Sequence, residues 1–559
     1  MEKNIAERVA QLRVWMKEQG VEAFVVPTMD AHNSEYVPAR WQCRQWLTGF
    51  TGSAGTAVLT ADEALMWTDS RYWLQAEEQL NGTPFRLMRD GQDETVNEWL
   101  RRHVQGRVGY LPDMMVEPLK EELFTNVEAV ALDSDPFDLF WTDRPTFPLS
   151  IAEHMPDELA GETAANKLKR LQDWLAEQGK EQVLLNDLSE IAWTLNLRGN
   201  DIPYNPYLIS FLLVRRDGQH TLYIHREQVP AEIETYLEGL NICIKPYEEA
   251  PRELEGDSPV TFWRAQKTEA EQAGFREAHL RDGVAMVRFL RMLDEWGSEP
   301  WTEMRVDREL TALRAQQPGF CGLSFETIAG YAHHGAIVHY EATPETDIPL
   351  ERKGLLLLDS GAHYDCGTTD ITRTIPLGPL TDEERRAFTL VLKGHLQLQH
   401  AVFPPSTTGL QLDALARMPL WRAGYDYGHG TGHGVGHRLG VHEGPIQIRK
   451  NCRRDTTLPL MLGQTITDEP GVYVEGKFGI RHENTLLVVT ACENSFGTFW
   501  TFEPLTRCPY DRRGIDMELL TPEESQWIDD YHALVWNDLS PLLTDEADKE
   551  WLRRATLPL

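Results

Sequence analysis

The segment LLLLDSGAHYDCGTTDITRT at residues 355–374 decides the fold of the second half of the chain. Two strand-like runs flank the turn-rich stretch YDCG at 364–367, which predicts a β-hairpin. Asp359 and Asp370 are equidistant from the midpoint between residues 364 and 365. In that symmetric register the two carboxylates face each other across adjacent strands, with Cβ atoms about 5 Å apart. Opposed like charges destabilise a hairpin, so the pattern favours a bound divalent cation, with two unrelated loop aspartates as the alternative.

Three later segments carry further candidate ligands. GHGTGHGVGH at 428–437 places His429 and His433 in a glycine-rich stretch whose backbone can approach a site closely. TDEPGVY at 467–473 places Glu469 at the end of a predicted strand, just before a Pro-Gly turn. FGIRHENTLLVV at 478–489 is predicted to be one strand, on which Arg481 and Glu483 share a face because strand side chains alternate. Each glutamate taken singly is also typical of a solvated strand end.

Together these segments supply four carboxylates and one imidazole. The candidate metal ligands are Asp359, Asp370, His433, Glu469 and Glu483. Oxygen-rich ligation with a single nitrogen suits pairs of Mn²⁺, Zn²⁺ or Co²⁺ ions, and the hardness of the ligands favours Mn²⁺. The chain has no HExxH motif, which excludes the helix of single-zinc metalloproteases.

Composition limits the class of protein. The 559 residues carry 54 Lys and Arg against 87 Asp and Glu, a formal net charge of −33. Such an acidic surface repels phosphate backbones and anionic lipid, so we expect no nucleic-acid and no membrane partner. The seven cysteines form no CxxC pair, the first residues lack the apolar stretch of a signal peptide, and no apolar run approaches a membrane span. A soluble cytoplasmic protein is therefore expected.

The chain is predicted to hold three domains. A helix–Gly–strand pattern at 11–27 recurs at an offset of 159 residues, which favours two related α/β domains over 1–155 and 156–263. Capping-box patterns at Thr268 and Thr381 predict helices in an α+β domain over 264–559. Met286, Leu290 and Leu293 are spaced as the buried stripe of the first of these helices.

At these residues the sequence resembles the creatinase/methionine-aminopeptidase superfamily, which has the pita-bread fold. Within it, nearly the whole chain is similar to the three-domain cytosolic branch of the aminopeptidase P (Xaa-Pro aminopeptidase) family. The matching motifs include DAHNSEYVPA at 30–39, WTDSRYWLQA at 67–76, SEIAWTLNLRGNDI at 189–202, GAIVHY at 335–340, VHEGP at 441–445 and TFEPLT at 501–506. The resemblance implies two creatinase-like N-terminal α/β domains followed by a pita-bread metallopeptidase domain with a C-terminal extension.

The resemblance also implies roles for the ligand set. Asp359 would chelate one of two divalent metal ions, and Asp370 and Glu483 would bridge both. His433 and Glu469 would complete the shell of the other ion. Glu469 is also the expected base that takes and returns a proton.

Four further residues are implied to contact substrate. His339 and His442 would contact the peptide and stabilise the developing oxyanion. His429 would lie in the substrate pocket without binding metal. Arg71 matches a substrate contact that can reach the active site of a neighbouring subunit, which implies a homodimer.

The implied activity is hydrolysis of the N-terminal Xaa-Pro bond of peptides, by attack of a water held between the two ions on the scissile carbonyl. A prolidase-type Xaa-Pro dipeptidase and a metal-free pita-bread binding module are the alternatives. His333, His334 and His437 depart from the family pattern, where relatives often carry smaller or polar residues. These departures leave the fine substrate preference open.

Overall fold

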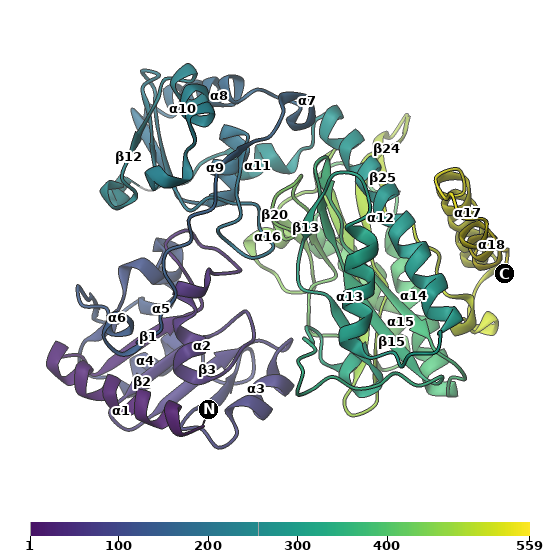
Figure 1. The fold of residues 1–559 in the computed structure, drawn as a ribbon, viewed down its shortest axis with the longest axis horizontal. Helices are drawn as coiled ribbons and strands as arrows, with labels where there is room; N and C mark the ends of the chain where they lie inside the picture. The colour runs from purple at the N-terminus through teal and green to yellow at the C-terminus, as the bar shows by residue number, and fades with distance from the viewer. Residues whose placement is uncertain (1, 255) are drawn as a thin grey trace. The chain divides into compact units, whose positions relative to one another are not determined.

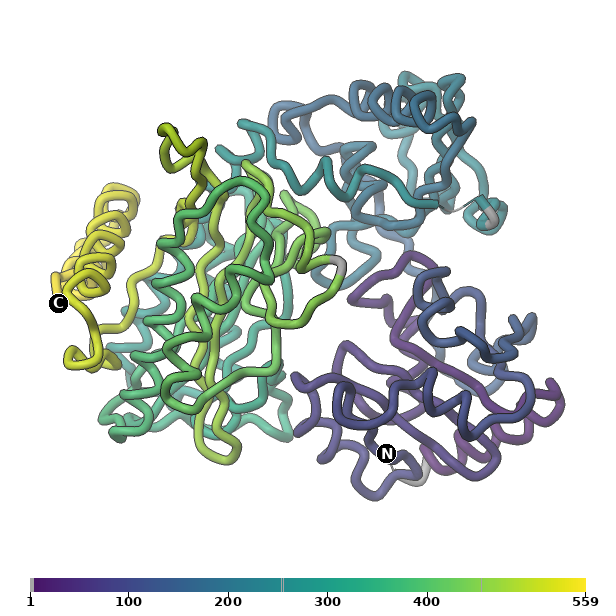
Figure 2. The backbone as a smooth tube through the Cα atoms, turned by 180° about the vertical axis from the view of Figure 1, so that it is seen from behind, coloured from purple at the N-terminus to yellow at the C-terminus, as the bar shows by residue number. Residues whose placement is uncertain are grey.

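The computed structural model describes residues 2–254 and 256–559. They form two compact units, which Figures 1 and 2 show from opposite sides. The N-terminal unit comprises Met1–His154 and Lys167–Asp257, and the C-terminal unit comprises Met155–Asn166 and Ser258–Leu559. The three domain boundaries expected from the sequence stay a prediction.

The N-terminal unit contains two main sheets. The first has the strand order β4-β3-β2-β1-β5-β6 and the second the order β12-β11-β10-β8. The strands are β1 Ala23–Pro27, β2 Thr56–Thr60, β3 Ala64–Thr68, β4 Arg86–Arg89, β5 Val108–Tyr110, β6 Ala129–Ala131, β7 Glu153–His154, β8 Gln182–Leu185, β9 Leu197–Arg198, β10 Phe211–Arg215, β11 His220–Tyr223 and β12 Ile242–Lys245. The helices around them are α1 Glu2–Gln19, α2 Cys43–Thr48, α3 Trp73–Leu80, α4 Val96–His103, α5 Glu117–Phe124, α6 Pro136–Phe140, α8 Ala164–Glu177, α9 Leu188–Leu195 and α10 Ala231–Gly239.

The repeated helix–Gly–strand pattern is confirmed at both positions. α1 and α8 are each followed by a glycine with positive φ, Gly20 at +67° and Gly179 at +65°. In each copy the N–H after the glycine donates to a carbonyl five positions earlier: Val21 to Met16 at 3.1 Å, and Lys180 to Leu175 at 2.8 Å. This is the Schellman termination, which requires the left-handed backbone that glycine adopts without strain. The chain then enters β1 and β8, respectively.

The C-terminal unit repeats one arrangement twice, a packed helix pair followed by strands (Figure 1). α12 (Glu269–Glu295) packs on α13 (Glu303–Arg314), and α14 (Asp382–Gln399) packs on α15 (Gly409–Arg422). The first pair precedes β13 Phe320–Leu323, β14 Ile328–Tyr331, β15 Leu355–Ser360, β16 Ala362–Tyr364, β17 Gly367–Thr368 and β18 Ile371–Pro376. The second precedes β19 Gly432–Gly434, β20 Glu443–Ile448, β21 Thr465–Asp468, β22 Gly471–Val474, β23 Phe478–Arg481, β24 Asn484–Asn494 and β25 Gly497–Pro504. The shorter helices are α7 Asp157–Ala160, α11 Val260–Ala265 and α16 Arg454–Thr457, and α17 Pro522–Leu539 and α18 Glu546–Ala555 end the chain.

Local sequence signals explain the two long helices. Thr268 caps α12 and Thr381 caps α14, each in a complete capping box, as predicted. The predicted stripe of α12 is also confirmed, because Met286, Leu290 and Leu293 are all buried. Their burial anchors α12 against the sheet β14-β15-β18, which contains Asp359 and whose strand β18 begins directly after Asp370.

The predicted hairpin is confirmed, but its predicted register is wrong. β15 and β18 are antiparallel, with Asp359 paired to Thr372. β16 and β17 continue the same register, with Tyr364 paired to Gly367, so the turn is centred one residue later than expected. A shift of one residue at the turn changes the pairing by two positions, which keeps Asp370 on the face of Asp359 but makes them diagonal neighbours.

The strand predicted over 478–489 is broken in the structure. β23 ends at Arg481 and pairs with β22, whereas β24 begins at Asn484 in another sheet. Glu483 lies at the break, where its N–H donates to Thr372 O at 3.1 Å. The chain changes sheets at this point, and the change brings Glu483 against the aspartate-bearing hairpin. Among the described residues, no helix is both long and apolar enough to span a lipid bilayer.

Candidate metal centre

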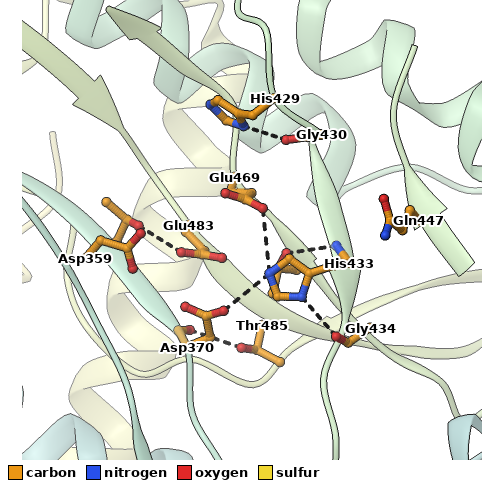
Figure 3. Close-up of polar contacts among 12 residues, drawn as sticks. Asp359, Asp370, His429, Gly430, His433, Gly434, Gln447, Glu469, Glu483 and Thr485 are labelled. Carbon is orange, nitrogen blue, oxygen red and sulfur yellow. Dashed lines mark hydrogen bonds and ion pairs between the residues drawn. The ribbon is translucent and has the colours of Figure 1, made fainter. Parts of the chain in front are cut away.

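Three of the predicted ligands form one cluster. Asp370, His433 and Glu483 each offer a donor atom, and these atoms all lie within 4.8 Å of one another. Glu469 joins them through an Oε1 atom 3.7 Å from His433 Nε2, and Asp370 Oδ2 is 3.5 Å from the same nitrogen. Figure 3 shows Asp370 and Glu469 in contact with the His433 ring, with Glu483 beside them and Asp359 on the far side of Glu483. The structure therefore brings together side chains from segments more than 100 residues apart.

Backbone contacts between two strands place His433 and Glu469. The N–H of Glu469, which follows β21, donates to Thr431 O at 2.7 Å, and the N–H of His433 donates to Thr467 Oγ1 at 3.1 Å. Gly432 permits this approach, since a Cβ at that position would lie 2.0 Å from Thr467 O. The glycine-rich stretch thus allows close backbone approach to the neighbouring strand, and its approach to a bound ligand stays a prediction.

A hydrogen bond fixes the tautomer of His433. Its Nδ1–H donates to Gly434 O at 2.9 Å, because a carbonyl oxygen can only accept. The other ring nitrogen, Nε2, faces Asp370 and Glu469. A histidine held through Nδ1 with Nε2 directed at carboxylates is the usual arrangement of a metal ligand.

Asp359 is held by a buried arginine. Arg481 Nη2 donates to Asp359 Oδ2 at 2.6 Å, and both side chains are buried. The other carboxylate oxygen, Oδ1, is buried without a hydrogen-bond partner among the described residues. A buried carboxylate oxygen without a donor is unfavourable, so this atom fits a cation.

The electrostatics of the metal-free cluster disfavour the ionised carboxylates. Burial raises the pKa of Asp370 well above its usual range, and the charges of Asp359 and Glu469 raise it further. Burial and then the neighbouring carboxylates likewise raise the pKa of Glu483. Divalent cations would reverse both effects, because they favour the ionised carboxylates. The donor set, its charge and the orphaned oxygen of Asp359 thus fit divalent metal ions.

Sequence reasoning did not assign three residues that organise this centre. Thr372 donates its hydroxyl to Glu483 Oε2 at 2.8 Å, and Arg481 Nε contacts the same hydroxyl oxygen at 3.2 Å. Tyr473 accepts from Arg481 Nη1 at 2.6 Å and donates to His429 Nε2 at 2.7 Å. Strand periodicity could have found Thr372, which is two residues from Asp370 and so on the same face.

The other predicted site residues have different surroundings. His442 lies beside His433, with ring centroids 4.3 Å apart and ring planes nearly perpendicular. His429 bonds Gly430 O (Figure 3) and also Tyr473. His339 is half-buried in the loop between β14 and β15. Arg71 belongs to the N-terminal unit, where it forms a bidentate pair with Asp69 at 2.8 Å. The assigned roles of these four residues stay a prediction.

Family models match almost the whole chain. The Metallopeptidase family M24 matches residues 273–490 and the C-terminal region of peptidase M24 matches 498–559. Two Creatinase/Prolidase N-terminal domain models match residues 8–136 and 143–273. The chain is also 38% identical to a probable Xaa-Pro aminopeptidase P of Laccaria bicolor, over 100% of the chain and 94% of that protein. The chain belongs to the Xaa-Pro aminopeptidase P family.

Further relatives agree with this membership. Aminopeptidase P2 of Arabidopsis thaliana is 37% identical, over 99% of the chain and 89% of its own length. The crystal structure of an X-prolyl aminopeptidase from Caenorhabditis elegans matches with a TM-score of 0.94 at 33% identity, covering 99% of this chain and 100% of that one. That protein is described as a cytosolic enzyme with a di-nuclear active site. The expected fold is confirmed: two creatinase-type N-terminal domains precede a pita-bread metallopeptidase domain.

Proposed function

We propose that this member of the Xaa-Pro aminopeptidase P family hydrolyses the bond between the first residue of a peptide and a proline in second position. The observation that carries the proposal is the convergence of Asp370, His433, Glu469 and Glu483, with Asp359 beside them, in a chain of this family. A metal-free binding module would have no use for buried, mutually repelling carboxylates. Their retention favours the enzyme.

Two divalent ions, with Mn²⁺ favoured over Zn²⁺ and Co²⁺, are the proposed cofactors. Asp359 would hold one ion, Asp370 and Glu483 both, and His433 and Glu469 the other. When bound, such ions lower the pKa of water toward neutrality and polarise the scissile carbonyl. The di-nuclear site of the worm relative supports the number of ions.

The protein's own residues would move the protons and hold the peptide. Glu469 is the most exposed of the five candidate ligands, with 19% of its side chain accessible, which suits a base that takes a proton and returns it to the leaving proline nitrogen. His339 and His442 would donate to the oxygen of the scissile carbonyl as it gains charge. The Arg481–Tyr473–His429 chain of hydrogen bonds would keep the His429 ring in one orientation beside the substrate.

Two peptides test the proposal against its nearest alternative. The purified protein, freed of metal and then supplied with Mn²⁺, is assayed on Ala-Pro-Ala and on the dipeptide Ala-Pro. The expected result is cleavage of the Ala-Pro bond of the tripeptide, which releases the first alanine and leaves Pro-Ala. Activity confined to the dipeptide would mean a prolidase-type enzyme. If neither peptide is cleaved, with or without Mn²⁺, the binding module is favoured.

A homodimer is also proposed, with Arg71 reaching the site of the neighbouring subunit. The supporting feature is an exposed apolar stripe on α15, formed by Leu415, Met418 and Trp421. Exposed apolar stripes of this kind typically mark protein contacts. Sedimentation of the wild type and of Met418→Glu tests it, since a dimer weakened by the charge is expected. A cytoplasmic location is proposed from the description of the worm relative.

A further inference from the structure

A buried glutamate outside the metal centre gathers three donors. Glu303 begins α13 and its side chain is fully buried. Its carboxylate accepts the N–H of Tyr331 at 2.8 Å, the Nδ1–H of His334 at 2.9 Å and the hydroxyl of Tyr340 at 2.9 Å. A buried carboxylate is tolerated only when such donors satisfy it. The three donors are therefore held in place, because the buried Glu303 carboxylate would otherwise lose its hydrogen bonds.

All three donors belong to one stretch of chain. Tyr331 ends β14, His334 lies in the short 3-10 helix Ala332–Ala336, and Tyr340 follows a few residues later. The His334 and Tyr340 rings also stack, with centroids 4.4 Å apart. Glu303 thus accepts hydrogen bonds from both ends of the loop of residues 332–340. His339, the residue next to Tyr340, lies inside this loop.

The opposite side of this loop packs against the strand that ends in Arg481. A Cβ on Gly479 would lie 1.6 Å from Gly335 O, so the two backbones are in direct contact. Arg481 Nη2 approaches Val338 O at 3.4 Å while holding Asp359. The loop is therefore enclosed between Glu303 and the wall of the metal centre, with little freedom to shift.

We propose that Glu303, His334 and Tyr340 are positioning residues, which hold this loop so that His339 meets the substrate in one orientation. The proposal rests on the proposed function, because it takes His339 to contact the reacting peptide. It also gives a role to His334, one of the histidines that depart from the family pattern. A displaced donor stabilises the transition state much less than a well-placed one. The hydrogen bonds to Glu303 should therefore affect kcat more than they affect KM.

The test measures kcat and KM on Ala-Pro-Ala with Mn²⁺-loaded protein. His334→Ala is expected to lower kcat about 10- to 100-fold with KM little changed, the range found when a supporting residue is removed. His334→Asn keeps an N–H donor and is expected to restore most of the rate. His333→Ala is a graded control: the exposed His333 ring lies against the His334 ring, with centroids 4.3 Å apart, but Glu303 accepts no hydrogen bond from it among the described residues, so a smaller loss of kcat is expected. Tyr340→Phe, a milder change, should also lower kcat.

A double-mutant cycle separates positioning from a merely structural role. In a His339→Ala background, His334→Ala is expected to cause no further loss, because the group it positions is already gone. Equal, additive losses in both backgrounds, or a wild-type kcat for His334→Ala, would overturn the proposal. Thermal unfolding of each variant identifies losses caused by misfolding, which His334→Asn and Tyr340→Phe should avoid.

Failure of the proposed function gives different results. A wild-type protein that cleaves no Xaa-Pro bond overturns the function itself. A His339→Ala variant with the wild-type rate overturns the role of His339, and the positioning inference with it, while leaving the function intact.

Discussion

Asp359 and Asp370 lie on one face of the β15–β18 hairpin as diagonal neighbours, because Asp359 pairs with Thr372 and not with Asp370. The diagonal leaves Asp359 beside Arg481 and sets Asp370 beside His433. Each aspartate thus faces a different partner, although the two remain close enough for the charge of Asp359 to raise the pKa of Asp370. This arrangement suits two adjacent ions better than one ion between opposed carboxylates.

Asp370→Asn is expected to abolish metal binding and activity together, since it removes a proposed bridge. In metal-free protein the same change should raise the melting temperature, because a neutral amide removes the cost of burying an ionisable carboxyl group beside Asp359 and Glu469. Metal content and thermal unfolding, with and without chelator, measure both effects. Asp365→Asn, at the half-exposed tip of the same hairpin, is the matched control and should keep its metal. Mn²⁺-dependent turnover in Asp370→Asn would contradict the assignment.

The stability of the metal-free protein should depend on pH through Asp370 and Glu483. Their folded-state pKa values lie well above the ordinary 3.8 and 4.5, so the folded protein retains protons that the unfolded chain releases. The stabilising contribution is complete below pH about 4 and is lost as pH rises through the raised values. Denaturant unfolding of metal-free protein at several pH values measures this decline.

An Asp370→Asn/Glu483→Gln variant cannot ionise at these positions and should show a shallower decline with pH than the wild type. Added Mn²⁺ should reverse the trend in the wild type, because metal binding requires the ionised carboxylates. Equal slopes for the two metal-free proteins would refute the electrostatic account.

His339→Ala should keep both metal ions and lose rate. The loss of one donor to a developing oxyanion costs about 3 kcal/mol, which corresponds to roughly a 100-fold lower kcat. His433→Ala is the informative comparison, since it should lose metal as well as rate. Elemental analysis beside steady-state kinetics distinguishes the two, and missing metal in His339→Ala would mean that the ligand set is wrong.

Arg481→Met should weaken metal binding about 10- to 100-fold, because Asp359 would lose the partner that orients it. The hydrogen bonds of Arg481 to Tyr473 and Thr372 would be lost too, so the melting temperature should fall. Lys477→Met, on the exposed turn after β22, loses only a surface ion pair and should change little. Titration of Mn²⁺ into each metal-free variant provides the measurement, and equal affinities would exclude the proposed role of Arg481.

Local patterns were sufficient for much of the fold. Thr268 and Thr381 correctly predicted the starts of α12 and α14, because a capping box satisfies N–H groups within four residues of the chain. Gly20 and Gly179 marked two helix ends because each termination needs a left-handed backbone. The five candidate ligands could also be named in advance, since residue type and motif spacing suffice to nominate a donor.

Packing between distant segments decided the rest. The register of the hairpin depends on where its turn is centred. The sequence alone also allowed a turn centred one residue earlier than the turn in the structure. Contacts between distant parts of the chain, up to 122 residues apart, decided three further features. They are the break before Asn484, the hydrogen bond from Arg481 to Asp359, and the hydrogen bonds that Glu303 accepts from residues 331–340. Such contacts leave no periodic trace in a single sequence, because burial and the satisfaction of buried charges are properties of the folded interior.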